Sequence, residues 1–280
     1  GNYATPYDYD PEEGIVKVPH SFADQIGAAG MIWSSPKDIS NYLTFLVNDG
    51  VYKNDTLVKP KTFRYLFKPH ALQPEGGMYP TTALTKPNWN TYGLGWFQQD
   101  YRGSKLDFHT GSLGGLVAIA GVVHDKNMAV YVFANLDHAE LRHAIMLKAI
   151  DLFVFNDDNR DWHTEVFELY NGFHEKELEK QKKKVDERAQ NTKPSLPLSA
   201  YNGVYNNKML GNATVTQIGD TLEVNFNSHI SYRASHWHFD TFITNKDPSW
   251  GEIFEIRFEL NNKGEIEQLD FMGEEFTKKE

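Results

Sequence analysis

The sequence has no cysteine among its 280 residues. This excludes disulfide bonds, zinc sites with cysteine ligands and thiol catalysis, and it leaves the compartment open, because a cysteine-free chain can function in either redox environment. The chain also lacks an apolar run of about 18 residues or more, so no membrane-spanning helix is expected. Positive charge is not in excess either, since 28 Lys and Arg are outnumbered by 38 Asp and Glu. Nucleic acid is therefore not an expected partner, because its binding needs a basic surface.

The residues that are present can build a substantial core. At 40% hydrophobic and 14% aromatic, the chain is long enough for one large domain or two ordinary ones. It starts with Gly1 in place of Met and shows no signal peptide, and we expect it to be a portion of a longer polypeptide.

One stretch in the middle of the chain combines strand patterns with reactive side chains. Leu116–Val123 and Met128–Ala134 are apolar runs joined by a short polar segment, which predicts an antiparallel hairpin buried on both faces. Just before it, Asp107–Ser112 places an imidazole, a hydroxyl and a glycine side by side. Gly114 and Gly115 follow, and glycines beside a strand suggest that something approaches the backbone closely. We expect any site to lie here.

Helical patterns flank this stretch. Ser34–Asp38 has a hydroxyl cap and a proline in the first turn, and apolar residues recur at helical spacing until Gly50. A short helix is expected at Lys61–Phe67. His138–Phe155 is apolar nearly all round, so it should pack on a sheet, whereas Glu165–Gln190 carries alternating charges typical of a solvated helix.

Beyond a linker-like segment at residues 191–197 the apolar period changes to two. Short strands with polar turns between them predict a small antiparallel sheet that closes toward a barrel or a sandwich. The expected strands are residues 214–216, 221–226, 239–244, 253–260 and 265–271.

Several motifs occur in an order that resembles a known family. They are Asn2–Tyr7, Ala28–Asp38, Tyr92–Trp96 (Tyr-Gly-Leu-Gly-Trp) and His109–Ser112 (His-Thr-Gly-Ser). With the hairpin and its following helix, they resemble the C-terminal half of serine hydrolases of the β-lactamase, penicillin-binding protein and esterase family, class C type. The rest of the chain is similar to the charged linker and small β domain often appended to such hydrolases.

The resemblance implies an α+β fold in three parts. These are a partial β-lactamase-like domain at residues 1–156, with an antiparallel sheet and packing helices, a charged helical linker at 157–195, and a small lipocalin-like antiparallel β-barrel domain at 196–280. It also implies a periplasmic or extracellular bacterial location.

The family transfers acyl groups through a serine ester and uses Ser-x-x-Lys, Tyr-x-Asn and Lys/His-Thr/Ser-Gly elements. His109-Thr110-Gly111 matches the third element. By resemblance, Thr110 would bind the carboxylate or amide of the substrate and Gly111 would let substrate lie along the strand. His109 would tune the local charge, and the backbone N–H of Ser112 would be an oxyanion-hole donor. The implied substrate is peptide-like or an ester, without cofactor or metal.

The first two elements have only weak matches, Ser34-Ser35-Pro36-Lys37 and Tyr52-Lys53-Asn54. Patterns this short arise by chance, only fourteen residues separate Lys37 from Tyr52, and Ser34 is better explained as a helix cap. We therefore expect the nucleophile to lie upstream of Gly1 and the chain to be inactive alone. A missing N-terminal half or a second copy would then cover an exposed sheet edge. The alternative is a non-catalytic module of that family, which binds peptide-like ligands or only assembles.

Two further patterns permit two interpretations each. His236 and His238 share a strand face near Asp240, which would suit a metal, but no third ligand is evident and a structural role is favoured. Tyr92 and Trp96 flank two glycines, and core packing is favoured over a place in a pocket wall.

Overall fold

The computed structural model describes residues 2–10, 13–21, 27–74, 77–228, 230–247 and 252–279. The chain divides into two compact units, unit 1 at residues 1–177 and unit 2 at residues 178–280. Unit 1 combines helices with antiparallel strands and unit 2 is a closed antiparallel barrel, which confirms the predicted α+β class. No helix among the described residues has both the length and the apolar character needed to cross a bilayer.

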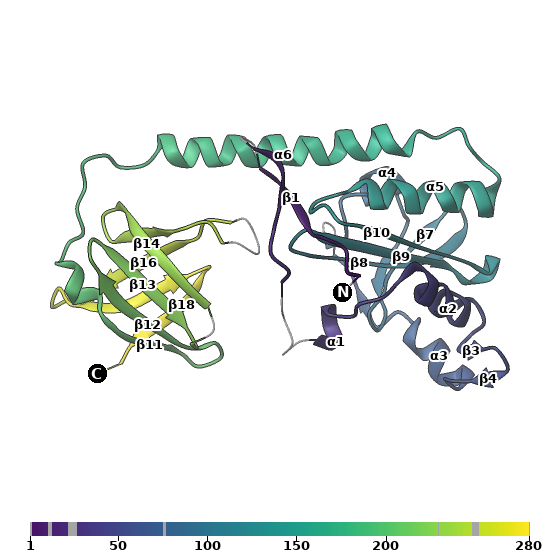
Figure 1. Cartoon of the computed structure of the whole chain (residues 1–280), viewed down its shortest axis with the longest axis horizontal. Coiled ribbons are helices and arrows are strands. Elements are labelled where there is room, and N and C mark those ends of the chain that lie inside the picture. Colours follow the sequence, from purple (N-terminus) through teal and green to yellow (C-terminus); the bar gives the residue numbers. More distant parts are fainter. Residues whose placement is uncertain are drawn as a thin grey trace. The chain divides into compact units, whose positions relative to one another are not determined.

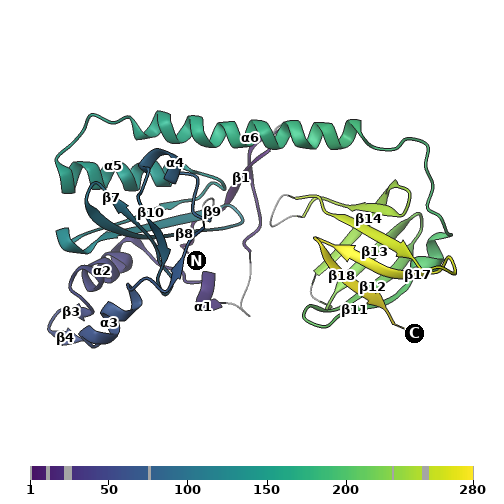
Figure 2. The same cartoon turned by 180° about the vertical axis from the view of Figure 1, so that it is seen from behind.

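Unit 1 is built around a six-stranded antiparallel sheet with the order β10-β9-β8-β7-β6-β5. Its strands are β5 (Ala71–Leu72), β6 (Asn90–Tyr92), β7 (Phe97–Tyr101), β8 (Ser104–Leu113), β9 (Leu116–Val123) and β10 (Met128–Ala134). The predicted hairpin is confirmed, because β9 and β10 pair along their whole length. Helices cover the two faces of the sheet (Figures 1 and 2), and β9 is largely buried between them, whereas β10 is only half-buried, so the predicted burial on both faces holds for β9 alone.

The other elements of unit 1 surround this sheet. They are β1 (Tyr7–Asp10), β2 (Gly14–Lys17), α1 (Gly27–Gly30), α2 (Pro36–Val47), β3 (Val51–Tyr52), β4 (Asp55–Thr56), α3 (Pro60–Leu66), α4 (Thr82–Thr85), the 3₁₀ turn η2 (His124–Lys126), α5 (Leu141–Phe155) and α6 (Trp162–Asp186), which continues into unit 2. The predicted start of α2 is confirmed, but its cap is Ser35, whose hydroxyl accepts from the N–H of Asp38 at 3.1 Å. Ser34 as the capping residue is therefore corrected to Ser35.

Two apolar clusters fill the two faces of the sheet. On one face, side chains of α5 pack on β8 and β9, and the cluster includes Leu106, Phe108, Ile119, Ala144, Met146 and Ile150. On the other face α2 and α3 contribute to a cluster that includes Leu46, Phe63, Ala120 and Val122. Gly121 allows the close approach of α5, because a Cβ there would lie 2.8 Å from the sulfur of Met146.

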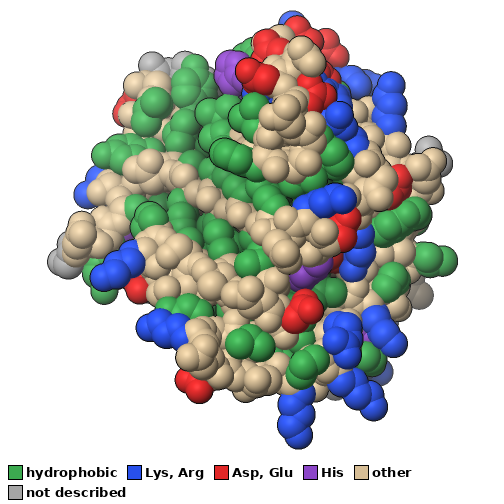
Figure 3. Space-filling model, turned by 90° about the vertical axis from the view of Figure 1, so that its right-hand side faces the viewer, with side chains coloured by type: hydrophobic (Ala, Val, Ile, Leu, Met, Phe, Trp, Pro, Cys, Tyr) green, Lys and Arg blue, Asp and Glu red, His purple; other side chains and the backbone are tan. Residues whose placement is uncertain are grey.

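The side of α5 that faces away from the sheet is apolar and exposed. Leu141, Ile145, Leu152 and Phe153 keep between 37% and 80% of their surface accessible. With residues 158–163 they line a hollow of about 480 Å³. Figure 3, which looks onto the right-hand side of Figure 1, shows hydrophobic side chains gathered on that side of the molecule. In addition, β10 pairs only with β9 among the described residues, so its second edge is open.

The first turns of α6 belong to the core of unit 1. Trp162 and Val166 are each 1% exposed. The indole N–H of Trp162 donates to Asp151 at 2.6 Å, and the same carboxylate accepts from the hydroxyl of Tyr101 at 2.7 Å and from Arg102 at 2.9 Å. Trp162 thus completes the core of unit 1, which extends to residue 177.

The N-terminal segment crosses the turn between β8 and β9. The backbone N–H of Tyr7 donates to the carbonyls of Gly115 and Asn135 at 3.4 and 3.2 Å. Gly115 has a φ of +77°, and a Cβ there would lie 2.6 Å from the Cβ of Pro6. The expected close approach is confirmed at Gly115, and the approaching group is the N-terminal segment of the chain itself.

Unit 2 is an eight-stranded closed barrel. It contains η3 (Leu198–Tyr201), β11 (Gly203–Asn207), β12 (Gly211–Ile218), β13 (Thr221–Phe226), β14 (Ile230–His238), β15 (Thr241–Thr244), β16 (Glu255–Leu260), β17 (Ile266–Phe271) and β18 (Glu274–Lys278). Its interior is filled by side chains no more than 5% exposed, among them Tyr205, Leu222, Phe242, Phe258, Leu269 and Phe276. Among the described residues the barrel therefore encloses a packed core, as small barrels do.

Candidate active site

The His-Thr-Gly motif lies at the end of β8, where the strand loses one neighbour. β9 pairs with β8 as far as Leu113, but β7 pairs with it only as far as Phe108. Residues 109–113 therefore have one edge without a strand partner among the described residues. The hydroxyl of Tyr79 donates to the carbonyl of Thr110 at 3.4 Å, so the polar backbone groups of Thr110 point to this free edge. Backbone direction repeats every second residue, which turns the N–H of Ser112 to the same edge.

The side chains of the motif alternate between the two faces of the sheet. His109 and Gly111 are exposed on one face, and a Cβ at Gly111 would meet no atom within 4 Å. Thr110 points to the α5 face and is 4% exposed. Its hydroxyl donates to the carbonyl of Ala118 at 2.8 Å and accepts from Nε of Arg142 at 2.9 Å. The hydrogen of this hydroxyl is therefore already engaged within the protein.

Behind Thr110, the start of α5 brings charged and aromatic groups together. Nη2 of Arg142 and Nε2 of His143 lie 3.4 and 3.5 Å from the carboxylate of Glu140. The ring of His143 lies between those of Tyr79 and Tyr170, with centroids 5.4 and 6.0 Å away. Burial lowers the pKa of His143 to about 4, so the ring is neutral near pH 7. The buried positive charge of this group is thus that of Arg142, which lies next to the Thr110 hydroxyl.

Several polar atoms in this cluster have no hydrogen-bond partner among the residues that the structure describes. They are Nη1 of Arg142, both ring nitrogens of His143, one carboxylate oxygen of Glu140 and the hydroxyl of Tyr170. Burial raises the pKa of Tyr170, and this keeps its hydroxyl protonated. None of these residues is among the site residues predicted from the sequence.

Near the free edge of β8, the ring of His109 is held by aromatic side chains. Its Nε2 lies 3.3 Å from the hydroxyl of Tyr92, and its ring stacks on Phe97 with centroids 5.5 Å apart and an interplanar angle of 25°. Partial burial lowers the pKa of His109 below its ordinary value, which favours the neutral imidazole.

Asp107 points to the same face as His109 but is fully buried. Its carboxylate accepts from the amide of Gln98 at 2.6 Å and pairs with Lys105 at 3.0 Å. Burial raises the pKa of Asp107, and the charge of Lys105 opposes this shift. These contacts give Asp107 a structural role beneath the site.

The weak matches to the first two family elements lie in other elements of unit 1. Ser34 precedes the cap of α2, and its hydroxyl donates to the carbonyl of Ser35 at 3.4 Å. Tyr52 lies in the separate β3–β4 hairpin, and its hydroxyl donates to Asn41 at 2.7 Å. Neither has a hydrogen bond to the His-Thr-Gly motif among the described residues.

The His236, His238 and Asp240 group of unit 2 makes structural contacts. Nε2 of His236 lies 2.9 Å from the carbonyl of Phe239, and Asp240 accepts from the hydroxyls of Ser195 and Tyr201. No cluster of three or more His, Asp or Glu side chains suited to a metal occurs among the described residues.

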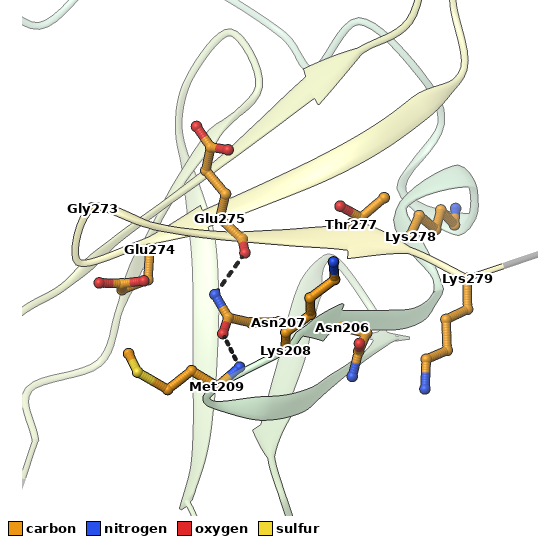
Figure 4. A pocket seen from close by; sticks show the side chains of 10 residues that line it. All are labelled: Asn206, Asn207, Lys208, Met209, Gly273, Glu274, Glu275, Thr277, Lys278 and Lys279. Carbon is orange, nitrogen blue, oxygen red and sulfur yellow. Dashed lines mark hydrogen bonds between the residues drawn. The ribbon is translucent and has the colours of Figure 1, made fainter.

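Unit 2 also has a surface pocket of about 660 Å³ where β11 and β18 diverge (Figure 4). The side chain of Asn207 crosses this seam and donates to the carbonyl of Glu275 at 2.9 Å. Two of the lysines at the rim are engaged, because Lys278 donates to the carbonyl of Ala200 and Lys279 donates to Asn212. We therefore interpret the pocket as a gap in strand pairing and not as a binding site for a charged ligand.

Comparisons with known proteins place the chain in a family. Residues 2–154 match the family described as Beta-lactamase, and residues 187–280 match a domain of unknown function, DUF3471. A search of curated proteins found no match.

Solved structures that are similar to the chain include three with related titles. The octameric penicillin-binding protein homologue from Pyrococcus abyssi is 16% identical with a TM-score of 0.42, over 98% of this chain and 53% of that one. SurE is 16% identical with a TM-score of 0.39, over 99% of this chain and 56% of that one. The C-terminal domain of a penicillin-binding protein is 27% identical with a TM-score of 0.27, over 33% of this chain and 94% of that one. This chain thus spans about half the length of the first two. The match over residues 2–154 covers more than half of the chain, which therefore belongs to the beta-lactamase family.

Proposed function

We propose that this chain supplies the substrate-side wall of the acyl-transfer site of a serine hydrolase, which acts on a peptide-like amide or an ester. The observation that carries this proposal is the free edge of β8 at residues 109–113, next to the exposed His109 and the open space beside Gly111. Family membership supports it, because serine-ester chemistry uses a Lys/His-Thr/Ser-Gly strand.

A peptide-like substrate would bind by adding a strand to this edge. The N–H of Ser112 would then donate to the substrate carbonyl oxygen as negative charge develops on it during attack. Arg142, which contacts Thr110 at 2.9 Å, favours a substrate with a negative group near that residue. Here Thr110 acts chiefly by holding Arg142, because its own hydrogen is bonded to Ala118.

In this proposal the attacking serine lies outside the chain. Its hydroxyl oxygen would form the ester with the substrate acyl group, and the departing amine or alcohol would take the hydroxyl proton. Ser34 is not assigned this role, because it sits beside the cap of α2 and its hydroxyl is bonded to Ser35. The chain alone would bind substrate without turning it over.

The test is a titration of the isotope-labelled chain with an N-acetylated dipeptide, followed by NMR. The amide signals of Thr110 and Ser112 should shift on binding. A Gly111→Val variant should still fold, because a Cβ at this position meets no atom within 4 Å. Its side chain would fill the space beside the strand edge, so these shifts should be lost. Shifts confined to other residues would contradict the proposal. A fluorescent penicillin should leave the chain unlabelled, and a covalent label that disappears in Ser34→Ala would show that the nucleophile lies within it.

A second candidate function is assembly, which the apolar face of α5 and the open edge of β10 favour. Unpaired strand edges and large apolar patches on one protein are normally covered by a partner. We propose that the nucleophile-bearing segment covers them in the complete enzyme and that a second copy covers them in the chain alone.

A further inference from the structure

We propose that Tyr92 is a positioning residue that fixes the ring plane and the tautomer of His109, so that the imidazole presents its Nδ1–H to the substrate side. The proposal rests on the proposed function, which makes the exposed face of β8 part of the site. It also gives a role to Tyr92, for which the sequence favoured core packing over a place in a pocket wall.

Two strand pairings bring Tyr92 close to the part of β8 that carries His109. Tyr92 ends β6 and pairs with Phe97 at the start of β7, and Phe97 pairs with Phe108 on β8. The ring of Phe97 is perpendicular to that of Tyr92 at 4.8 Å and stacked on that of His109 at 5.5 Å. Phe97 therefore restricts rotation of the His109 ring, and the hydroxyl of Tyr92 meets the ring edge at Nε2, 3.3 Å away.

The direction of this hydrogen bond follows from proton affinities. The imidazole is neutral near pH 7, because burial lowers the pKa of His109. A phenolic O–H is a good donor and the unprotonated imidazole nitrogen is the better acceptor, so Tyr92 donates and Nε2 accepts. The ring hydrogen then resides on Nδ1.

The consequence is that His109 offers one hydrogen-bond donor, its Nδ1–H, in a fixed orientation. No described group of the protein hydrogen-bonds Nδ1 of His109, and the residue is exposed. The Nδ1–H is therefore free to donate to an acceptor on the substrate or on the nucleophile-bearing segment. Without Tyr92, the imidazole would be free to adopt either tautomer and would lose its fixed donor.

The test is the ¹⁵N NMR signature of the His109 ring in the wild-type chain and in Tyr92→Phe, recorded between pH 5 and 8. In the wild type, Nδ1 should show the signal of a protonated nitrogen and Nε2 that of an unprotonated acceptor. In Tyr92→Phe, signal should pass to the other tautomer and the pKa of His109 should rise, because the hydrogen bond that stabilises its neutral form is gone. Tyr52→Phe, which removes a hydroxyl bonded to Asn41, is the matched control and should change neither reading.

A wild-type His109 protonated on Nε2, or a Tyr92→Phe variant with unchanged tautomer and pKa, would overturn the proposal. Unchanged amide signals of Phe97 and Phe108 in Tyr92→Phe establish that the variant is folded. This measurement uses no ligand and no activity, so its outcome is separate from that of the Gly111→Val titration, which tests the proposed function.

Discussion

At the scale of single residues, the imidazole of His143 is fully buried, and neither ring nitrogen is hydrogen-bonded to a described residue, although Nε2 lies 3.5 Å from the carboxylate of Glu140. Burial lowers its pKa to about 4, with Glu140 opposing the shift and Arg142 adding to it. The unfolded chain protonates this residue near pH 6.5. As pH falls from 6.5 to 4 the unfolded state therefore binds the proton first, and the free energy of unfolding of unit 1 decreases by up to about 3 kcal/mol.

The variant His143→Phe isolates this contribution, because it keeps an aromatic ring and removes the titration. Urea unfolding between pH 7 and 4 should show a shallower loss of stability in the variant than in the wild type. His174→Phe, a replacement at an exposed position of α6, serves as control and should keep the wild-type slope. Equal slopes in all three proteins would show that His143 does not titrate as its burial requires.

The residues of the site differ in how far the sequence could reveal them. His109, Thr110 and Gly111 are consecutive, so their motif is visible locally, and the period of a strand already predicts that His109 and Thr110 face opposite ways. The partners that define their chemistry are not local. Arg142 contacts Thr110 from 32 positions away, and Tyr92 contacts His109 from 17. Only the sheet order and the packing of α5 bring these side chains together.

At the scale of elements, Asp151 joins α5 to the sheet and to α6. Its carboxylate is 1% exposed and accepts from Tyr101, Arg102 and Trp162. The variant Asp151→Asn should lower the free energy of unfolding of unit 1 by roughly 3 kcal/mol, because Arg102 and the indole N–H lose a charged acceptor. Hydrogen exchange of α5 and early α6 amides would detect this loss.

Asp157→Asn is the matched control, because Asp157 also contacts Arg102, at 3.0 Å, but at the surface. Solvent screens that pair, so exchange in α5 should stay close to the wild type. Equal effects of the two substitutions would mean that the buried network does not tie α6 to unit 1.

The elements that the sequence revealed are those with a strong apolar pattern. The hairpin β9–β10 was predicted with the bounds it has, and α2, α5 and the barrel strands β13 and β17 were found within a few residues. β11 and β18 were missed and β14 was anticipated only at its end, His236–His238, because polar residues fill the outward positions and leave short inward patterns, such as the lone Phe276 of β18. β15 begins at Thr241 because Phe239 forms the preceding turn with a φ of 46°.

At the scale of the whole molecule, the open edge of β10 and the apolar face of α5 predict association of the chain when it is alone. Burial of one large side chain contributes about 1.5–3 kcal/mol. Phe153 is 80% exposed, so Phe153→Asp should weaken self-association by about tenfold or more. Sedimentation over a range of protein concentrations would measure this.

Met209→Asp in unit 2 is the control, because Met209 is 79% exposed, and it tests whether any added charge weakens self-association. A wild-type chain that stays monomeric at all concentrations would mean that a second copy does not cover these surfaces, whereas equal loss in both variants would move the contact away from α5.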